Sequence, residues 1–297
     1  MSLLPSQWIK GEIRRRALLA GAVAFGCARV QPVEESVREA YKKWITLGRH
    51  GTMGYMERNS EVRFNPGLLV PGARTVISMA FSYRPVGGYH HPNIADYALG
   101  KDYHIVLKRR LAVVAGFIAD QYGAQSRVCV DTAPILERYW AARSGVGFIG
   151  RNHQLIVPGV GSEVFLSEIV TTLELQPDAP IDTECHNCNR CRMACPAGTF
   201  SDVRRCHSYL TIEHRGELPS DIVLGAHVYG CDICQRVCPF NVGEKPEPLP
   251  DFHPDPRLLM LDKTAMTTLS SGEWRRLTKE SAMSRVPYKI LRRNLFH

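Results

Sequence analysis

The chain has 297 residues, of which 44% are hydrophobic and 22% are charged. This balance is ordinary for a globular protein with a sizeable core. No apolar run approaches the roughly 18 residues that a membrane-spanning helix needs, so we expect no membrane association. The formal net charge is +8 at pH 7. A basic excess of this size is compatible with a polyanionic partner such as RNA, although a solvated basic surface would produce the same charge.

Three arginines at positions 14–16 precede an apolar run at 17–28, a pattern that faintly resembles a secretory signal. We interpret it as a buried helix-to-strand segment of the first domain, because the run is short and no small-residue cleavage site follows it. A cytoplasmic location is therefore expected.

Apolar spacing predicts the elements that follow in the first part of the chain. Helices are expected at 34–47, 105–122 and 134–144, and strands at 75–81, 127–131, 154–157 and 163–173. The last two strands are expected to pair across the turn at 158–161. These elements indicate the α+β class, with a mixed α/β layered domain over residues 1–180.

A cysteine-rich module over residues 181–245 follows a linker and ends at a proline-rich stretch. Residues 246–297 are expected to form a basic, helical C-terminal segment in which Trp274, Leu277 and Leu291 pack. Basic side chains of this segment either bind phosphates or form a solvated helix face; they include Arg275, Arg276, Arg292 and Arg293.

Eight of the ten cysteines lie between residues 185 and 238, in tight arrays. In a cytosolic protein such arrays indicate bound metal rather than disulfides. The other two, Cys27 and Cys129, are expected to be small buried apolar residues.

The first array, Cys185-x2-Cys188-x2-Cys191-x3-Cys195 followed by proline, has the spacing of bacterial ferredoxins with two [4Fe–4S] clusters. A structural zinc site, the alternative, usually takes four ligands in two pairs. The fourth cysteine is expected at the start of a helix that points away from the first three. It would therefore bind the other cluster.

The second array, Cys231-x2-Cys234-x3-Cys238, has one cysteine fewer, and Cys206 between the arrays can supply the missing thiolate. Because the fourth cysteine of each array binds the other cluster in such ferredoxins, we predict two ligand quartets. The first quartet is Cys185, Cys188, Cys191 and Cys238. The second quartet is Cys195, Cys206, Cys231 and Cys234.

The glycine-rich stretch at 145–150 matches the G-x-G-x-x-G pattern of dinucleotide-binding folds. It follows a predicted helix instead of a strand, so a Rossmann fold with bound NAD or flavin cannot be inferred from it. The large domain that precedes the clusters nevertheless indicates that they deliver electrons to a further centre.

Six stretches, in order along most of the chain, resemble the epoxyqueuosine reductases. They are residues 50–56 (HGTMGYM), 97–104 (YALGKDYH), 130–138 (VDTAPILER), 145–152 (GVGFIGRN), 205–213 (RCHSYLTIE) and 229–235 (YGCDICQ). The chain departs from the family after the glycine-rich turn, where Arg151-Asn152-His153 replaces the usual Lys-Asn-Thr.

The resemblance implies a nitroreductase-like or reductive-dehalogenase-like cobalamin-binding domain, followed by the two-cluster ferredoxin-like module and a short helical C-terminus. It implies that the epoxide of epoxyqueuosine, at the tRNA wobble position, is reduced to queuosine by cobalamin fed from two [4Fe–4S] clusters. Asp131 matches the family's proton donor, whereas the residues alone would also allow a helix N-cap ahead of Pro134. The positions that would line the cobalamin are Arg58, Asp131, Leu155, Leu166, Ser208 and Asp232.

Other cobalamin proteins bring a histidine to cobalt with an Asp-x-His-x-x-Gly motif. Here Asp102-Tyr103-His104 begins that motif but Leu107 occupies the glycine position, so we predict that no protein histidine binds the cobalt. Two alternatives stay open, a corrinoid and iron–sulfur reductase of the reductive dehalogenase type, and a non-catalytic two-cluster electron carrier. The expected partners are tRNA carrying epoxyqueuosine and an external one-electron donor, and we expect a monomer.

Overall fold

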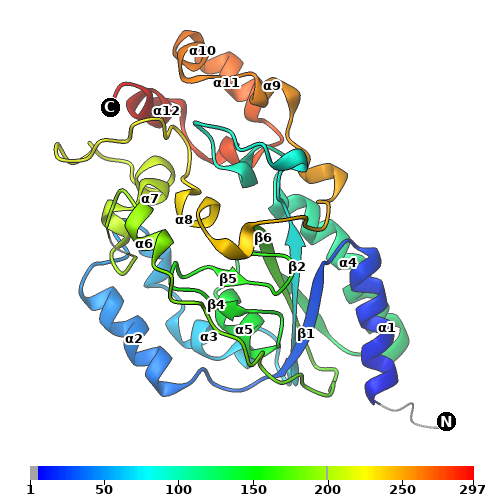
Figure 1. The fold of residues 1–297 in the computed structure, drawn as a ribbon. Coiled ribbons are helices and arrows are strands. Elements are labelled where there is room, and N and C mark those ends of the chain that lie inside the picture. The colour runs from blue at the N-terminus through cyan, green and yellow to red at the C-terminus, as the bar shows by residue number, and fades with distance from the viewer. Residues whose placement is uncertain (1–5, 199) are drawn as a thin grey trace.

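A four-stranded antiparallel sheet forms the centre of the protein (Figure 1). The computed structural model describes residues 6–198 and 200–297. The strands lie in the order β1 (Ala24–Arg29), β2 (Thr75–Ser82), β6 (Val164–Thr171) and β3 (Ser126–Cys129). Every residue of β2 is buried, which explains why its sequence is a continuous apolar run instead of an alternating one.

Helices cover both faces of this sheet. On one face α1 (Ser6–Leu19) and α4 (Tyr103–Tyr122) pack on Ile77 and Met79 of β2. On the other face Val76 of β2 packs with α2 (Glu35–Thr46), α3 (Ser60–Phe64) and α5 (Glu137–Arg143). Successive side chains of a strand point to opposite faces, so β2 contributes to both cores.

Most elements agree with the sequence-based predictions to within a few residues. The run at 17–28 forms the end of α1 and all of β1 up to Ala28, with Ala17 and Cys27 fully buried. The predicted pairing of 154–157 with 163–173 is wrong. β5 (Leu155–Ile156) pairs with β4 (Phe148–Ile149), and only a bridge between Val157 and Gly161 closes the turn. The reason is that both edges of β6 are already paired, with β2 and β3.

The glycine-rich stretch at 145–150 leads from α5 into the β4–β5 hairpin and binds no strand of the central sheet. A Cβ atom at Gly147 would lie 2.4 Å from the carbonyl oxygen of Ile156, so only glycine allows this close approach. Close packing of the hairpin therefore explains the motif without a bound nucleotide.

The cysteine module contains three short helices, and the C-terminal segment four. These are α6 (Arg190–Ala194), α7 (His207–Ile212), α8 (Ile233–Arg236), α9 (Pro256–Leu259), α10 (Lys263–Thr268), α11 (Ser271–Thr278) and α12 (Tyr288–Leu295). Trp274 and Leu291 are buried and Leu277 is partly buried, in a core that also contains Leu99 and Val228. Because the C-terminal segment shares this core with the other two predicted domains, the boundaries at 180 and 245 stay a prediction.

No helix in the described part of the chain is both long and apolar enough to cross a lipid bilayer.

Removal of a buried side chain from the α1–α4 core should destabilise the sheet domain. We expect Leu111→Ala to lower the free energy of unfolding by about 2–5 kcal/mol, because Leu111 is 0% exposed and its loss leaves a cavity. The matched control, Leu19→Ala, removes a side chain that is 74% exposed and should change stability by no more than about 0.5 kcal/mol. Urea denaturation followed by circular dichroism measures both, and equal effects would contradict the assigned core.

Candidate functional site

A cavity of about 1220 Å³ opens between the sheet domain and the cysteine module. Pockets for drug-sized ligands measure roughly 300–1,000 Å³, so this cavity has room for a larger, macrocyclic ligand. Tyr97, Tyr103, Phe165 and Leu166 line it from the sheet domain. α7 and the residues around α8 line it from the cysteine module.

A buried polar network fixes the cysteine module against the sheet domain. Asn241 of the module accepts a hydrogen bond from the Ser162 backbone at 2.7 Å and donates to the Ser162 hydroxyl at 3.0 Å. Gln235 donates to the Tyr83 hydroxyl at 3.0 Å, and Asn241 donates to the Gln235 carbonyl at 2.9 Å. Gly161 has φ +104°, and a Cβ there would lie 2.1 Å from the Asn241 side-chain oxygen. Each bond stabilises this arrangement by about 0.5–1.5 kcal/mol net, and an unpaired buried partner would cost about 1–3 kcal/mol.

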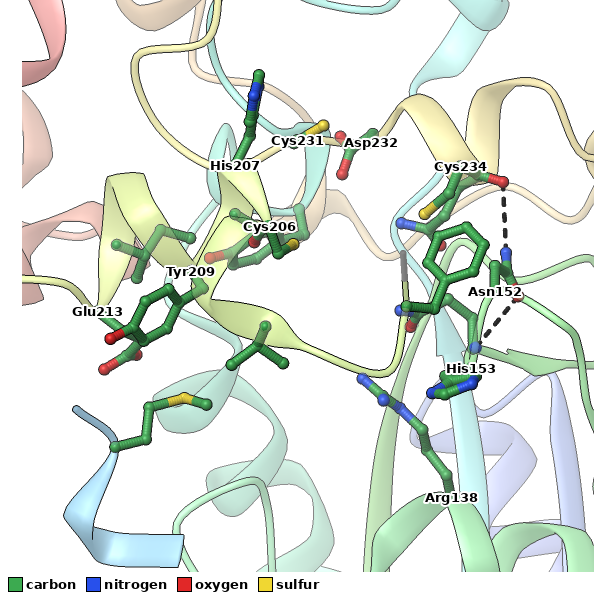
Figure 2. A pocket seen from close by; sticks show the side chains of 18 of the residues that line it. Arg138, Asn152, His153, Cys206, His207, Tyr209, Glu213, Cys231, Asp232 and Cys234 are labelled. Carbon is green, nitrogen blue, oxygen red and sulfur yellow. Dashed lines mark hydrogen bonds between the residues drawn. The ribbon is translucent and has the colours of Figure 1, made fainter. Parts of the chain in front are cut away.

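The eight clustered cysteines fall into two spatial groups, and all are free thiols. The large cavity is lined by Cys195, Cys206, Cys231 and Cys234. A separate, small pocket is lined by Cys185, Cys188, Cys191 and Cys238. Figure 2 shows Cys206, Cys231 and Cys234 on one side of the cavity, with Asp232 beside them and Arg138 and His153 across from them. This grouping supports the predicted quartets, including the exchange of Cys195 and Cys238.

The local backbone explains why the fourth cysteine of each array leaves its neighbours. Cys195 and Cys238 both precede proline, which disfavours helical geometry at the preceding residue, and both are extended. α6 ends just before Cys195, so the expectation that a helix begins there is wrong. A 3-10 turn does begin at Pro239. Cys206 lies at the start of α7; burial raises the pKa of its thiol, while the backbone amides of Tyr209 and Ser208 favour the thiolate.

Asp131 lines the cavity, and its carboxylate contacts three polar side chains. Its Oδ2 accepts a hydrogen bond from the Tyr103 hydroxyl at 2.8 Å and lies 3.0 Å from His104 Nε2. The other ring nitrogen of His104 lies 2.6 Å from Asp102 Oδ1, so the imidazole bridges two carboxylates. Arg285 Nη1 lies 3.8 Å from Asp131 Oδ2 and 3.2 Å from His104 Nε2.

These contacts shift the proton affinities of the group in opposite directions. Desolvation disfavours the charge of Asp131, but hydrogen bonds from His104 and Tyr103, together with the Arg285 guanidinium, outweigh it and lower the pKa of Asp131. Desolvation likewise opposes the charge of His104, but its bonds to Asp102 and Asp131 raise the pKa of the imidazole. These opposite directions favour a proton on His104 over one on Asp131.

Five of the six predicted cobalamin-lining residues line the cavity: Asp131, Leu155, Leu166, Ser208 and Asp232. Arg58 is exposed and does not line it. The N-cap interpretation of Asp131 is wrong, because α5 begins at Glu137 and its N-cap is Leu136.

Three residues of the site were not singled out from the sequence as functional: Tyr103, Glu137 and Arg285. Tyr103 and Glu137 lie inside stretches that carry the family resemblance, and this position could have marked them as functional. Arg285 lies in the basic C-terminal segment and was not named from the sequence, because only the tertiary fold brings it to Asp131.

Two arginines of the basic C-terminal segment are used within the fold. The Arg293 guanidinium donates to the carbonyls of Leu210, His214 and Gly216. Arg292 donates to the Thr267 carbonyl. Their internal bonds favour a structural role over phosphate binding, whereas Arg275 and Arg276 are exposed.

The cavity fits a large cofactor that is partly apolar and receives electrons. Its walls combine aromatic and aliphatic side chains with buried Asp232, and one quartet of thiols opens into it. Both ring nitrogens of His104 contact carboxylates, so this histidine has no free nitrogen for a metal. That no protein histidine binds the cobalt stays a prediction.

Two family models match this chain. Residues 63–132 match the model described as "Epoxyqueuosine reductase QueG, DUF1730". Residues 184–241 match the model described as "4Fe-4S double cluster binding domain", and this range contains all eight clustered cysteines.

Curated and solved proteins match over nearly the whole chain. An epoxyqueuosine reductase of Cellulophaga algicola is 35% identical over 95% of each chain. An epoxyqueuosine reductase solved with an epoxyqueuosine-modified tRNA-Tyr stem loop has a TM-score of 0.89 at 28% identity, over 98% of this chain and 80% of that chain. The Bacillus subtilis enzyme, solved with its catalytic aspartate loop swung out of the active site, has a TM-score of 0.88 at 27% identity, covering 98% and 81%. Because the Cellulophaga algicola relative is 35% identical over 95% of each chain, this chain belongs to the epoxyqueuosine reductase family.

Proposed function

We propose that this chain reduces the epoxide of epoxyqueuosine, at the wobble position of tRNA, to the alkene of queuosine. The observation that carries the proposal is the cavity itself, which has four thiols on one side and the Asp131 group on another. Electrons and protons can therefore meet at one ligand. The chemistry demands this, because removal of an epoxide oxygen as water consumes two electrons and two protons.

Two cofactors are needed for the electron supply. The eight cysteines would hold two [4Fe–4S] clusters, which carry single electrons. A cobalamin in the cavity would supply a strongly reducing cobalt centre, and Leu155, Leu166, Ser208 and Asp232 would line it. We leave Arg58 out of this set because it lies outside the cavity wall.

Asp131 is the proposed proton donor to the departing oxygen. It is an anion in the resting site, so a proton must first reach it, and His104 holds one 3.0 Å away. Asp102 on the far side of the imidazole keeps the ring oriented and favours its charged form. Tyr103 and Arg285 then stabilise the carboxylate that remains after transfer.

The partners follow from this reaction. The solved relative carries a modified tRNA stem loop, and we propose the corresponding tRNA as the substrate here. Cys188 is exposed, whereas Cys191 and Cys238 of the same quartet are buried, so we propose that an external one-electron donor reaches the first cluster near Cys188. We further propose that the enzyme acts as a monomer in the cytoplasm.

The central experiment is mass spectrometry of nucleosides from epoxyqueuosine-containing tRNA after incubation with reduced, anaerobically reconstituted enzyme. Queuosine is the expected product. A protein of the dehalogenase type would leave the tRNA unchanged and would not be retained on a tRNA column. A simple electron carrier would bind iron and sulfide but no cobalt, which metal analysis detects after incubation with cobalamin.

Replacement of the proposed acid should abolish turnover without disturbing binding. We expect Asp131→Asn to lower kcat at least ~100-fold, because an amide cannot deliver the proton that a general acid supplies. Cobalamin content and tRNA affinity should stay as in the wild type. Asp120→Asn, at an exposed position of α4, is the matched control. Wild-type queuosine formation by Asp131→Asn would remove Asp131 from the role of acid.

Loss of one predicted ligand should remove one cluster only. We expect Cys206→Ala to lower the iron content from about eight to about four atoms per chain, because the first quartet does not include it. Cys129→Ala, which changes a buried cysteine outside the arrays, should keep both clusters. Iron analysis and electron paramagnetic resonance of the reduced protein measure this; full iron content in Cys206→Ala would refute the assignment.

The raised pKa of His104 predicts the alkaline limb of the pH–rate profile. Below this pKa the imidazole carries the reserve proton, and the proton is lost as the pH rises through it, so kcat/KM should fall there. In His104→Asn only Asp131 can hold the proton, and the limb should move to lower pH because a carboxyl group ionises at lower pH than an imidazole. An unmoved limb would show that another group controls it.

A further inference from the structure

The backbone of Asp131 adopts a left-handed conformation, which aspartate tolerates better than most residues other than glycine. Its φ is +55°, in the left-handed region that residues other than glycine rarely occupy. The residue lies beyond β3, which ends at Cys129, and ahead of α5, which begins at Glu137. No helix or strand of the described chain therefore contains it.

Among the residues that the structure describes, the Asp131 amide has one hydrogen-bond partner, which belongs to a packed helix. It donates to Glu137 Oε1 at 2.5 Å. Glu137 is the first residue of α5, whose Trp140 and Ala141 are 0% exposed against the sheet. The carboxyl group of Glu137, on a packed helix, therefore binds the backbone amide of Asp131, the proposed acid.

Within this loop the Thr132 and Ile135 amides donate to the carbonyls of Val130 and Ala133, and other partners contact its side chains. Tyr103 bonds the Asp131 carboxylate, and Lys108 donates to the Thr132 hydroxyl at 2.9 Å. Lys108 is exposed, whereas Tyr103 is partly buried and stacks on Phe165. These two bonds reach side chains of the loop, whereas the Glu137 bond holds the Asp131 amide itself.

We propose that Glu137 is a positioning residue, which holds the Asp131 loop in place so that the Asp131 carboxyl faces the cavity. The catalytic part of this inference rests on the proposed function. The structural part, that Glu137 fixes the Asp131 backbone, does not depend on it. Loss of the bond would let the loop leave the cavity and would separate Asp131 from His104.

The surroundings of Glu137 indicate that it acts as a neutral acceptor. Desolvation and the charge of Asp131 raise its pKa to about 8, while the bond from the Asp131 amide, Arg138 and His104 act in the opposite direction. Glu168 on β6 is 0% exposed, none of the described residues bonds its carboxylate oxygens, and its own pKa is raised by burial and by Glu137. A neutral carboxyl accepts through its carbonyl oxygen, and the amide of glutamine offers the same atom.

Hydrogen exchange of the wild type and three variants tests the hold directly. In Glu137→Ala the amides of residues 130–133 should exchange about tenfold faster, the effect of one lost hydrogen bond, because the loop opens more often. In Glu137→Gln the exchange should stay close to that of the wild type, because the acceptor oxygen is kept. Glu39→Ala, at an exposed position of α2, is the control and should not change it. Unchanged exchange in Glu137→Ala would overturn the proposal.

Kinetics of the reconstituted enzyme give the second readout. Glu137→Ala should lower kcat about tenfold and leave KM for tRNA unchanged, and Glu137→Gln should restore most of the rate. A loss that Gln does not repair would mean that the carboxyl does more than position the backbone, and would contradict the proposal. If the wild type forms no queuosine, the proposed function fails, while the exchange experiment still decides whether Glu137 holds the loop.

Discussion

The buried hydrogen-bond network around Asn241 is the constraint on which the site depends. The cavity lies between two parts of the chain, because the sheet domain supplies one wall and the cysteine module supplies the other. Asn241, Gln235 and Ser162 join the two where β6 begins, and all three are buried. Buried polar groups demand their partners, so this network admits one arrangement of the two parts. The side chain at residue 161 has to be absent for it to form.

The positions of the two thiol quartets indicate a direction for the proposed electron transfer. The first lies at a small pocket beside an exposed loop, and the second opens into the cavity. The exchange of Cys195 and Cys238 ties the two quartets together, since each array contributes to both. Electrons that enter at the first quartet, near the exposed Cys188, would therefore arrive beside the ligand in the cavity, where the proposed acid also lies.

The Asp131 group separates the storage of a proton from its delivery. A carboxylate surrounded by His104, Tyr103 and Arg285 is a poor reservoir, because these partners favour its charged form. The imidazole between two carboxylates is a good one. In the proposed mechanism, proton delivery depends on the position of the Asp131 backbone, which Glu137 of α5 is proposed to hold. Catalytic chemistry and loop position are thus assigned to different residues.

Sequence alone determined the features that depend on near neighbours in the chain. Cysteine spacing predicted both quartets, and apolar periodicity predicted the main helices and strands, because ligand loops and amphipathic faces are local. The partner of the 154–157 strand was mispredicted, since strand pairing depends on which edges the rest of the sheet leaves free. Arg285 and Glu168 reach the Asp131 region from distant segments, and no local pattern marks them. Only the tertiary structure decided these contacts, because they form when separate layers of the fold pack together. Burial in that packing also changes the free energy of each charged group.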